Sequence, residues 1–561
     1  VMKYVILKFC ILLVLVVSCE PLDQIPETAV STDGFFNEPS EFEISLNALY
    51  QQRLWIQDIK TWNDDSHHRG GGFINNAISR ATLNPTSSEL NNTWVLGYEA
   101  IKTANALLAE VEERRSNFAE GSLDRIEGEA RAIRAYFYGR LLAKFGHVPL
   151  ITTVLTVEES FEVVRAPLDE VKAFMYSEFD RAAELLSDSN ENRATRGFAL
   201  GMKARYALYM EDFAIARDAA KEVIDSGTYG LDPDFSTMFT KAGADSPEPI
   251  YFIPYSFELG ITWNQNGGAR GHITRNAGGF GAIMPTWEAM GIFECTDGQT
   301  IDQSPLYDPH DPFENRDPRM TETIVALETE WLGYIYQSHP DSLEVLQTTT
   351  GNRVRNNDTR ANAIFASFTG FVWKKGIEQS WADNRQADPN VMLLRYGDVL
   401  LMYAEALIEL NENLGEARDV LNELRNRAYG NSGVYPEITE TDQAGLRTRL
   451  RRERRVELMF EAGLRFQDLM RWRVAGRALA KTLVGLPAPQ DQDREQWPFN
   501  DQILPVVDED GIVDVKPDEL VANGFARLLE SYEFDENRMY LWPIPAEDIL
   551  LNSGLTQNPG Y

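Results

Sequence analysis

The segment Arg451–Trp472 constrains the fold more than any other part of the chain, because it places many charges inside a helical pattern. Its apolar residues recur at helical spacing, while Glu453, Glu457 and Glu461 follow one another at intervals of four along a neighbouring face. Residues 447–473 hold nine arginines against four acids. Planar guanidinium groups pair well with carboxylates through two parallel hydrogen bonds. We therefore predict a network of internal ion pairs that fixes a C-terminal helix to its neighbours.

A basic block of this kind is also typical of proteins that bind nucleic acids. The charge of the whole chain argues against that class, because 53 Lys and Arg stand against 86 Asp and Glu, which gives a net charge of −33. A polyanion would be repelled everywhere except at the block. We therefore expect no nucleic-acid partner.

Several segments, in order along the chain, resemble the sequence blocks of one protein family. They are Glu129–Leu150, Asn315–Arg319, Arg395–Leu407, Arg451–Trp472 and Leu541–Tyr561. The last of these matches the terminal motif of that family almost residue for residue. On these blocks the chain resembles the SusD/RagB family of bacterial surface lipoproteins that capture nutrients, over essentially its whole mature length.

The resemblance implies a mainly α-helical fold. Helix pairs of the tetratricopeptide type would form a scaffold, and loops with short strands would form the ligand-binding region. We expect a single domain over residues 46–561, with the scaffold mainly at 90–227 and 390–473. A loop-rich insert is expected at 231–388 and an irregular C-terminal region at 487–561.

The residues themselves also indicate paired helices, because one short pattern occurs twice. Ala216–Val223 and Ala417–Leu424 share an Ala-Arg-Asp start and similar spacing, and each follows a longer helical segment rich in small and aromatic residues. The two copies lie far apart, so the sequence alone does not predict a regular solenoid. Glycine clusters and aromatics without helical period in residues 231–388 favour ordered loops.

The first residues are typical of a bacterial lipoprotein. An apolar run over residues 11–17 follows two lysines and is too short to span a bilayer, which favours a signal peptide over residues 1–18. Cys19 directly follows a small residue, as in a lipobox, and would carry the acyl chains, with residues 19–45 as a tether and the start of the domain. An ordinary signal peptide with an incidental cysteine is the alternative. We expect a surface-exposed, lipid-anchored protein of the outer membrane.

Sugar recognition requires flat aromatic faces together with amide, carboxylate or guanidinium groups that bind hydroxyls. Three glycine-rich or irregular loops offer this mixture. Trp62, Trp263 and Trp287 stand in polar, glycine-rich surroundings, so we expect them to be exposed, although each is about as well explained as a loop anchor. The full set of candidate ligand-binding residues is Trp62, Asp65, His67, Arg69, Trp263, Asn266, Trp287, Trp331 and Tyr334. We expect Trp94, Trp472 and Trp542 to be structural instead.

The resemblance implies a binding protein that captures an oligosaccharide or polysaccharide and delivers it to a SusC-like, TonB-dependent outer-membrane transporter. A peptide-binding relative is the main alternative, and a helical glycoside hydrolase is a weaker one. No catalytic residue, cofactor or metal site is predicted, because the chain lacks a nucleophile elbow, a P-loop and a metal-binding helix motif. His67 and His68 have no partner at zinc-site spacing, and Asp508–Gly511 is predicted to be a hairpin turn.

Overall fold

The computed structural model describes residues 35–55, 62–69, 77–78, 80–189, 192–264, 268–461, 463–492 and 499–561. The expected signal peptide over residues 1–18, Cys19 and the candidate Asn266 lie outside these ranges. Across the residues that are described, no helix combines the length and the apolar character needed to cross a membrane.

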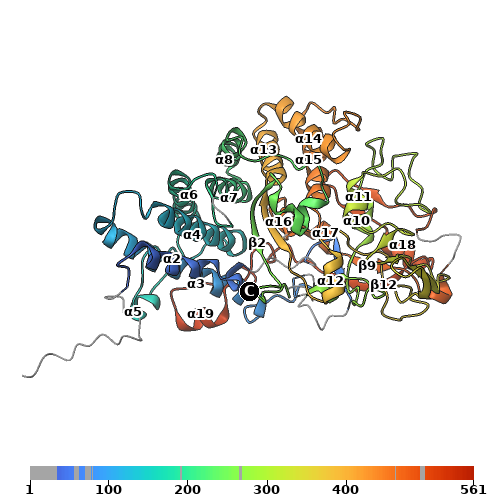
Figure 1. Cartoon of the computed structure of the whole chain (residues 1–561), viewed down its shortest axis with the longest axis horizontal. Coiled ribbons are helices and arrows are strands. Elements are labelled where there is room, and N and C mark those ends of the chain that lie inside the picture. The colour runs from blue at the N-terminus through green and yellow to red at the C-terminus, as the bar shows by residue number, and fades with distance from the viewer. Residues whose placement is uncertain are drawn as a thin grey trace, which may run out of the picture.

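The first half of the chain forms a layer of successive antiparallel helices, drawn in blue and teal in Figure 1. The helices are α2 (Pro39–Asn47), α3 (Ser88–Arg114), α4 (Asp124–Phe145), α5 (Val157–Ser160), α6 (Leu168–Leu185), α7 (Arg196–Tyr209) and α8 (Phe213–Asp225). Helix α3 packs on α4, α4 on α6, α6 on α7 and α7 on α8. In α8 the buried residues Ala216, Ala219, Ala220 and Val223 share one face, which is the face turned to its neighbours.

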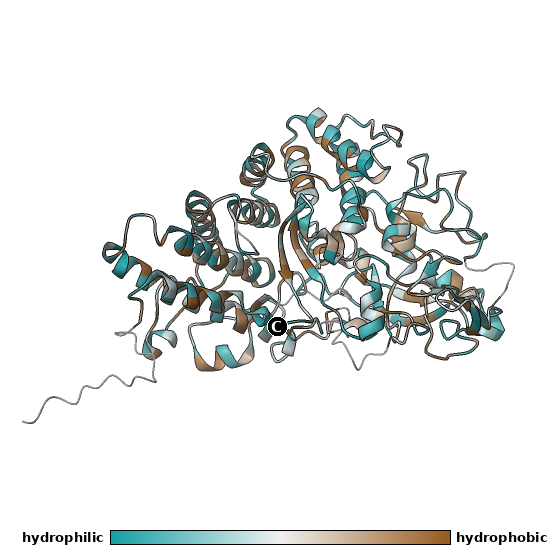
Figure 2. Cartoon of the chain, viewed as in Figure 1, coloured by the Kyte–Doolittle hydropathy of each residue, from teal (hydrophilic) through white to brown (hydrophobic). Residues whose placement is uncertain are grey.

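A second helical group follows much later in the chain and packs directly on the first. It consists of α13 (Tyr396–Leu410), α14 (Leu414–Ala428), α15 (Gln443–Glu457), α16 (Leu464–Arg471) and α17 (Ala475–Leu479). Helix α13 contacts α7 and α8 on one side and α14 and α15 on the other. Its apolar residues are buried almost all round, and the hydropathy colouring of Figure 2 shows its brown faces within the molecule. The predicted fold class, mainly α with paired helices, is therefore confirmed.

The predicted arginine-rich helix is interrupted, and this corrects the expectation of one continuous element. Helix α15 ends at Glu457, and α16 begins only at Leu464. Between them Phe460 and Gly463 have φ angles of 65° and 73°, in the left-handed region that ends a helix. Lys375 donates hydrogen bonds to the carbonyl oxygens of Glu457 and Met459, at 3.1 and 3.0 Å, and so holds the break in place.

The remaining chain forms short strands that pair antiparallel in small separate sheets. The pairs are β1 (Ser66–His68) with β3 (Ile283–Pro285), β2 (Pro249–Pro254) with β8 (Asn390–Arg395), β9 (Thr482–Gly485) with β12 (Arg527–Ser531), and β10 (Val506–Val507) with β11 (Val513–Asp514). A further sheet has the order β4 (Glu330–Trp331), β5 (Tyr334–Ile335), β6 (Glu344–Gln347) and β7 (Asn352–Arg355). The β10–β11 pair confirms the hairpin predicted around residues 508–511.

Short helices and turns connect these strands. The α-helices are α9 (Gly268–His272), α10 (Trp287–Gly291), α11 (Arg319–Thr323), α12 (Gln379–Asn384), α18 (Pro517–Ala522) and α19 (Ala546–Leu551). The 3₁₀ helices are Ala48–Tyr50, Gln52–Trp55, Arg115–Asn117, Thr237–Phe239, Lys241–Asp245 and Pro489–Asp491. Most of this irregular part lies on the side of the molecule away from α2–α6, where Figure 1 labels α10, α18, β9 and β12.

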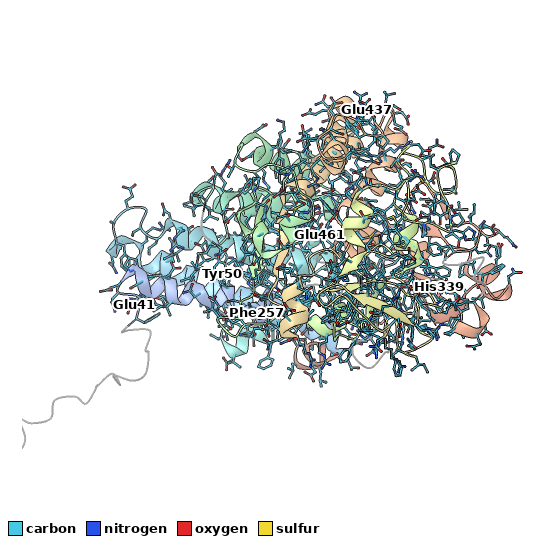
Figure 3. The ribbon with its side chains drawn as sticks, turned by 45° about the vertical axis from the view of Figure 1, so that its right-hand side comes forward. Glu41, Tyr50, Phe257, His339, Glu437 and Glu461 are labelled. Carbon is cyan, nitrogen blue, oxygen red and sulfur yellow. The ribbon has the colours of Figure 1, made fainter. Side chains whose placement is uncertain are left out.

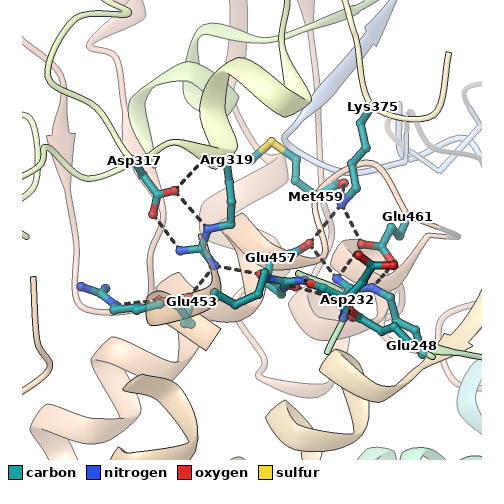
Figure 4. Close-up of polar contacts among 12 residues, drawn as sticks. Asp232, Glu248, Asp317, Arg319, Lys375, Glu453, Glu457, Met459 and Glu461 are labelled. Atoms are coloured by element: carbon teal, nitrogen blue, oxygen red, sulfur yellow. Dashed lines mark hydrogen bonds and ion pairs between the residues drawn. The ribbon is translucent and has the colours of Figure 1, made fainter. Parts of the chain in front are cut away.

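A network of buried ion pairs joins the irregular part to the second helical group (Figure 4). Arg319 donates to Glu453 and Glu457 at 2.5 and 2.9 Å. Arg395 donates to Glu457 and Glu461 at 2.8 and 2.9 Å, and Arg427 also donates to Glu457. Figure 3 places Glu461 within the molecule and labels the exposed Glu437 at its rim. The predicted structural role of the arginine block is confirmed by these pairs.

The surrounding arginines determine the charge state of Glu457. Its side chain is fully buried, and burial alone would raise its pKa. The positive charges of Arg427, Arg395 and Arg319 outweigh this effect and hold the pKa of Glu457 well below its usual value. The network therefore keeps a charged carboxylate in the core, where it is stable only while these partners remain.

Candidate ligand-binding site

The expectation that Trp62, Trp263 and Trp287 are exposed is wrong, because their exposed fractions are only 4%, 5% and 4%. The ring of Trp62 packs edge-on against Trp542 and Phe466, at centroid distances of 5.4 and 5.7 Å. Polar, glycine-rich neighbours in the sequence did not reveal these contacts, because they come from residues more than 400 positions away. The alternative reading of these tryptophans as loop anchors fits the structure.

Trp263 and Trp287 anchor different loops. The ring of Trp263 lies 5.0 Å from His272 and 5.8 Å from Trp381. Trp287 donates from Nε1 to the carbonyl oxygen of Thr369 at 2.9 Å, so it supports the loop that contains this residue. The cavity beside Trp287 has a volume of about 30 Å³, enough for a water molecule but not for a sugar ring.

Asp65 and His67, two further candidate ligand-binding residues, are also buried. Asp65 accepts hydrogen bonds from Nε and Nη2 of Arg455 at 2.9 and 2.6 Å, and the adjacent Asp64 pairs with Arg465. These two aspartates therefore belong to the structural arginine network. Burial lowers the pKa of His67 to about 3, so its ring is neutral at pH 7.

The described residues show no group of three or more His, Cys, Asp or Glu side chains arranged to hold a metal ion. Trp331 and Tyr334, the last two aromatic candidates, face each other across the β4–β5 hairpin. Both are half-buried, and Trp331 packs partly against a small core that includes Val325 and Tyr336. Their assignment to a ligand site stays a prediction.

Arg69 is the candidate that the structure places beside an exposed aromatic ring. It follows β1, and its backbone N–H donates to the carbonyl oxygen of Ala282 at 2.8 Å. Its guanidinium carbon lies 5.5 Å from the ring centroid of Phe365 and 5.8 Å from that of Phe368. Phe365 is 58% exposed, so it offers a free face of the kind that an apolar sugar face can cover.

Two further arginines lie against the ring of Phe368. The guanidinium carbon of Arg527, on β12, lies 4.3 Å from the centroid of Phe368, and that of Arg360 lies 5.3 Å away. We call Arg69, Arg360, Phe365, Phe368 and Arg527 the Phe368 cluster. A similar pair joins α9 to the loop after it, since the guanidinium carbon of Arg270, in α9, lies 4.4 Å from the ring centroid of Phe280 in that loop, and Phe280 is 39% exposed.

The loop that carries Phe365 and Phe368 is fixed through its main chain. The carbonyl oxygen of Phe368 accepts a hydrogen bond from the backbone N–H of Leu486 at 2.8 Å. The carbonyl oxygen of Gly370 accepts from Tyr336 Oη and Ser338 Oγ at 2.9 and 2.8 Å. Together with the bond from Trp287 to the intervening residue, these contacts hold the loop on the packed interior. The cluster is therefore a semi-exposed surface on a rigid base, which is a common setting for recognition.

Sequence reasoning missed most of this cluster. It weighed tryptophan and tyrosine rings but not phenylalanine, although Ile364 and Phe365 stand side by side in a segment without helical period, which is a usable signal for exposure. Arg360 and Arg527 gave no signal, because nothing in either local sequence indicates that they meet at one ring.

Comparisons with known proteins agree with the fold. The model of the SusD family matches residues 247–561, more than half of the chain. The chain belongs to the SusD family. A second family model, described as starch-binding and associating with the outer membrane, matches residues 31–208.

Individual relatives of the SusD family match along almost the whole chain. The SusD-like protein P2 of Formosa agariphila is 23% identical, with 100% of each chain covered. A SusD-like carbohydrate-binding protein of Bacteroides fragilis superposes with a TM-score of 0.76 at 24% identity, over 93% of this chain and 99% of its own. A laminarin-binding SusD-like protein superposes with a TM-score of 0.61 at 21% identity, over 93% and 99%. At these identities the two structures support the SusD fold.

Proposed function

We propose that this SusD-family protein binds a glycan on the surface formed by the Phe368 cluster. The observation that carries the proposal is the exposed ring of Phe365 beside the guanidinium of Arg69, at 5.5 Å. An aromatic face packs against the apolar side of a sugar ring, while guanidinium groups bind its hydroxyls. The structural neighbours described as carbohydrate-binding and laminarin-binding support the same class of ligand.

The ligand test uses two neighbouring residues in one loop. Phe365→Ala removes the proposed platform, whereas Ile364→Ala removes an equally accessible apolar side chain, since Ile364 is 71% exposed. In an affinity gel that contains the polysaccharide, we expect Phe365→Ala to be retained less than the wild type and Ile364→Ala to be retained as strongly. The thermal transitions of both variants should be unchanged. Equal retention by both variants would overturn the assignment of the site.

Two further measurements separate binding from catalysis and from peptide capture. Purified protein is incubated with the polysaccharide that retains it in the gel, and new reducing ends are measured over time. We expect none, because binding alone is proposed. Release of oligosaccharides would identify a hydrolase, and calorimetric binding of peptides without any glycan would identify the peptide-binding alternative.

Delivery to a partner is the second part of the proposal. We infer that a lipid on Cys19 holds the protein at the outer membrane, where it passes its ligand to a SusC-like, TonB-dependent transporter. The family description that includes outer-membrane association supports this location. In the native host, Cys19→Ala should move the protein from the membrane fraction to the soluble fraction. A tagged wild-type protein should co-purify with one outer-membrane transporter, and its absence would contradict the delivery step.

A further inference from the structure

The Phe368 cluster brings together positive charges that have no carboxylate partner. Arg69, Arg360 and Arg527 all approach one phenyl ring, at 5.8, 5.3 and 4.3 Å. Arg275 is also close enough to Arg69 for the two charges to repel each other. Within the described ranges none of these four arginines forms an ion pair, unlike the arginines of the buried network.

Their hydrogen-bonding capacity is also largely unused within the described part of the chain. Buried nitrogens without a hydrogen-bond partner occur in Arg69 (Nη1), Arg275 (Nε), Arg360 (Nε) and Arg527 (Nε and Nη2). The side chain of Arg360 donates only from Nη1, to the carbonyl oxygens of Leu486 and Pro487 at 3.3 and 3.1 Å. A buried donor without a partner is costly, so these guanidinium groups would gain from an acceptor that reaches them.

Burial and mutual repulsion both act on these groups. Burial lowers the pKa of Arg69 to about 10, with a further contribution from Arg275. The pKa of Arg527 is also lowered to about 10, by burial and by Arg360. Arg69 and Arg527 therefore remain charged at pH 7, and the fold holds these positive charges together at an energetic cost.

Acids in neighbouring segments are engaged elsewhere. Glu530, on the same strand as Arg527, pairs with Arg80 and lies 3.9 Å from His67. Asp358 attracts Arg275 but accepts its hydrogen bonds from the backbone N–H groups of Arg275 and Asn276, at 2.7 and 3.2 Å. In a chain with 86 acids and a net charge of −33, unpaired arginines at one surface are therefore an unusual local arrangement.

We propose that the Phe368 cluster recognises anionic substituents of a glycan, either sulfate esters or uronate carboxylates. This proposal rests on the proposed glycan-binding function and specifies its ligand class. The guanidinium groups would pair with the anion through parallel hydrogen bonds, while the sugar ring covers the face of Phe365. The Arg270–Phe280 pair offers the same chemistry to a second sugar residue of the glycan.

The test compares glycans of similar length that differ in charge: a sulfated galactan, its desulfated form, a polyuronate and a neutral β-glucan. Calorimetry at low and high salt measures each affinity. We expect at least one anionic glycan to bind about tenfold or more tightly than the neutral chains, since charge-assisted hydrogen bonds are the strong ones. Its affinity should fall with salt. The sulfated and uronate samples distinguish the two sources of negative charge.

Variants then locate the effect. Arg69→Gln, Arg360→Gln and Arg527→Gln, singly and together, should weaken binding of the anionic glycan by a larger factor than binding of a neutral glycan, with Arg→Lys substitutions intermediate. Arg418→Gln, on α14, is the control, because it removes the same charge at a distant exposed ion pair. Circular dichroism confirms folding of each variant.

The outcomes separate this inference from the proposed function. Tighter anionic binding that the Arg→Gln variants abolish supports the inference. If a neutral glycan binds as tightly as the anionic glycans, independently of salt, and still responds to Phe365→Ala, the inference is wrong and the proposed function stands. If no glycan of any charge binds, both are wrong.

Discussion

Two arginine-rich regions of this SusD-family protein use the same side chain for opposite purposes. In the network around Glu457, arginines are fully buried and each is matched by carboxylates, for example Arg395 by Glu248, Glu457 and Glu461. In the Phe368 cluster, arginines are only half-buried and face a ring and one another. The difference teaches that the partner, not the residue type, separates a structural arginine from one available to a ligand.

The largest expected effect tests the structural side of this comparison. Arg395→Met removes a buried cation and leaves Glu248, Glu457 and Glu461 with one partner fewer. We expect the free energy of unfolding to fall by about 3–5 kcal/mol, as for other buried pairs that lose one member. Urea unfolding followed by circular dichroism measures the change. A decrease in the free energy of unfolding no larger than that caused by Arg217→Met, which breaks the surface pair of Arg217 with Glu412, would contradict the role of the network.

A comparable loss is expected where a buried tryptophan supports the loop that carries Phe365 and Phe368. Trp287→Ala removes a core side chain and the hydrogen bond to Thr369. Truncation of a buried aromatic costs about 3–5 kcal/mol, so the midpoint of urea unfolding should shift strongly. An unchanged midpoint would restore the earlier reading of Trp287 as an exposed platform.

Acid should weaken the network but not the Phe368 cluster, whose only titratable side chains are those of arginines. The pKa values of Glu457 and Glu461 are depressed by their basic partners, against the effect of burial. Below pH 4.5, the pKa of a glutamate in the unfolded chain, the unfolded chain binds protons at these two residues that the folded protein does not bind. Stability should therefore fall by about 1.4 kcal/mol per pH unit for each such group as the pH decreases.

One buried acid opposes this trend at higher pH. Burial raises the pKa of Asp358 to about 6, so between that value and its unfolded value of 3.8 the folded protein binds the proton first. Protonation of Asp358 therefore adds stability as the pH falls through this window. Urea unfolding at several pH values, in wild type and Asp358→Asn, separates the two contributions. A flat profile down to pH 3 would contradict the assigned shifts.

The smallest expected effect tests the other side of the comparison. Arg527→Met removes an unpaired guanidinium and keeps an apolar stem and a sulfur beside Phe368. The lost cation–π contact and the relieved burial of unpaired donors nearly cancel, so we expect the free energy of unfolding to change by less than about 1 kcal/mol. The same urea titration checks it. A loss equal to that of Arg395→Met would show that both regions are structural.

The sequence predicted the helices and the role of the arginine block, because helical periodicity and charge balance are local and additive properties. The contacts that decide exposure are not local. Asp65 meets Arg455 from 390 positions away, and Trp62 is covered by Trp542. The Phe368 cluster combines residues from separate loops and a strand, so no single segment of the sequence contained its pattern.

The loop that carries Phe365 and Phe368 is held by hydrogen bonds to its own backbone carbonyls, from Leu486, Trp287, Tyr336 and Ser338. Such bonds do not depend on which side chains the loop displays. Substitutions at the exposed positions Ile364 and Phe365, whose side chains make none of these bonds, can therefore change the surface while its anchoring stays the same. Under the proposed function, and in a family whose members here share about a quarter of their residues or less, this loop is a place where ligand preference can diverge without loss of the fold.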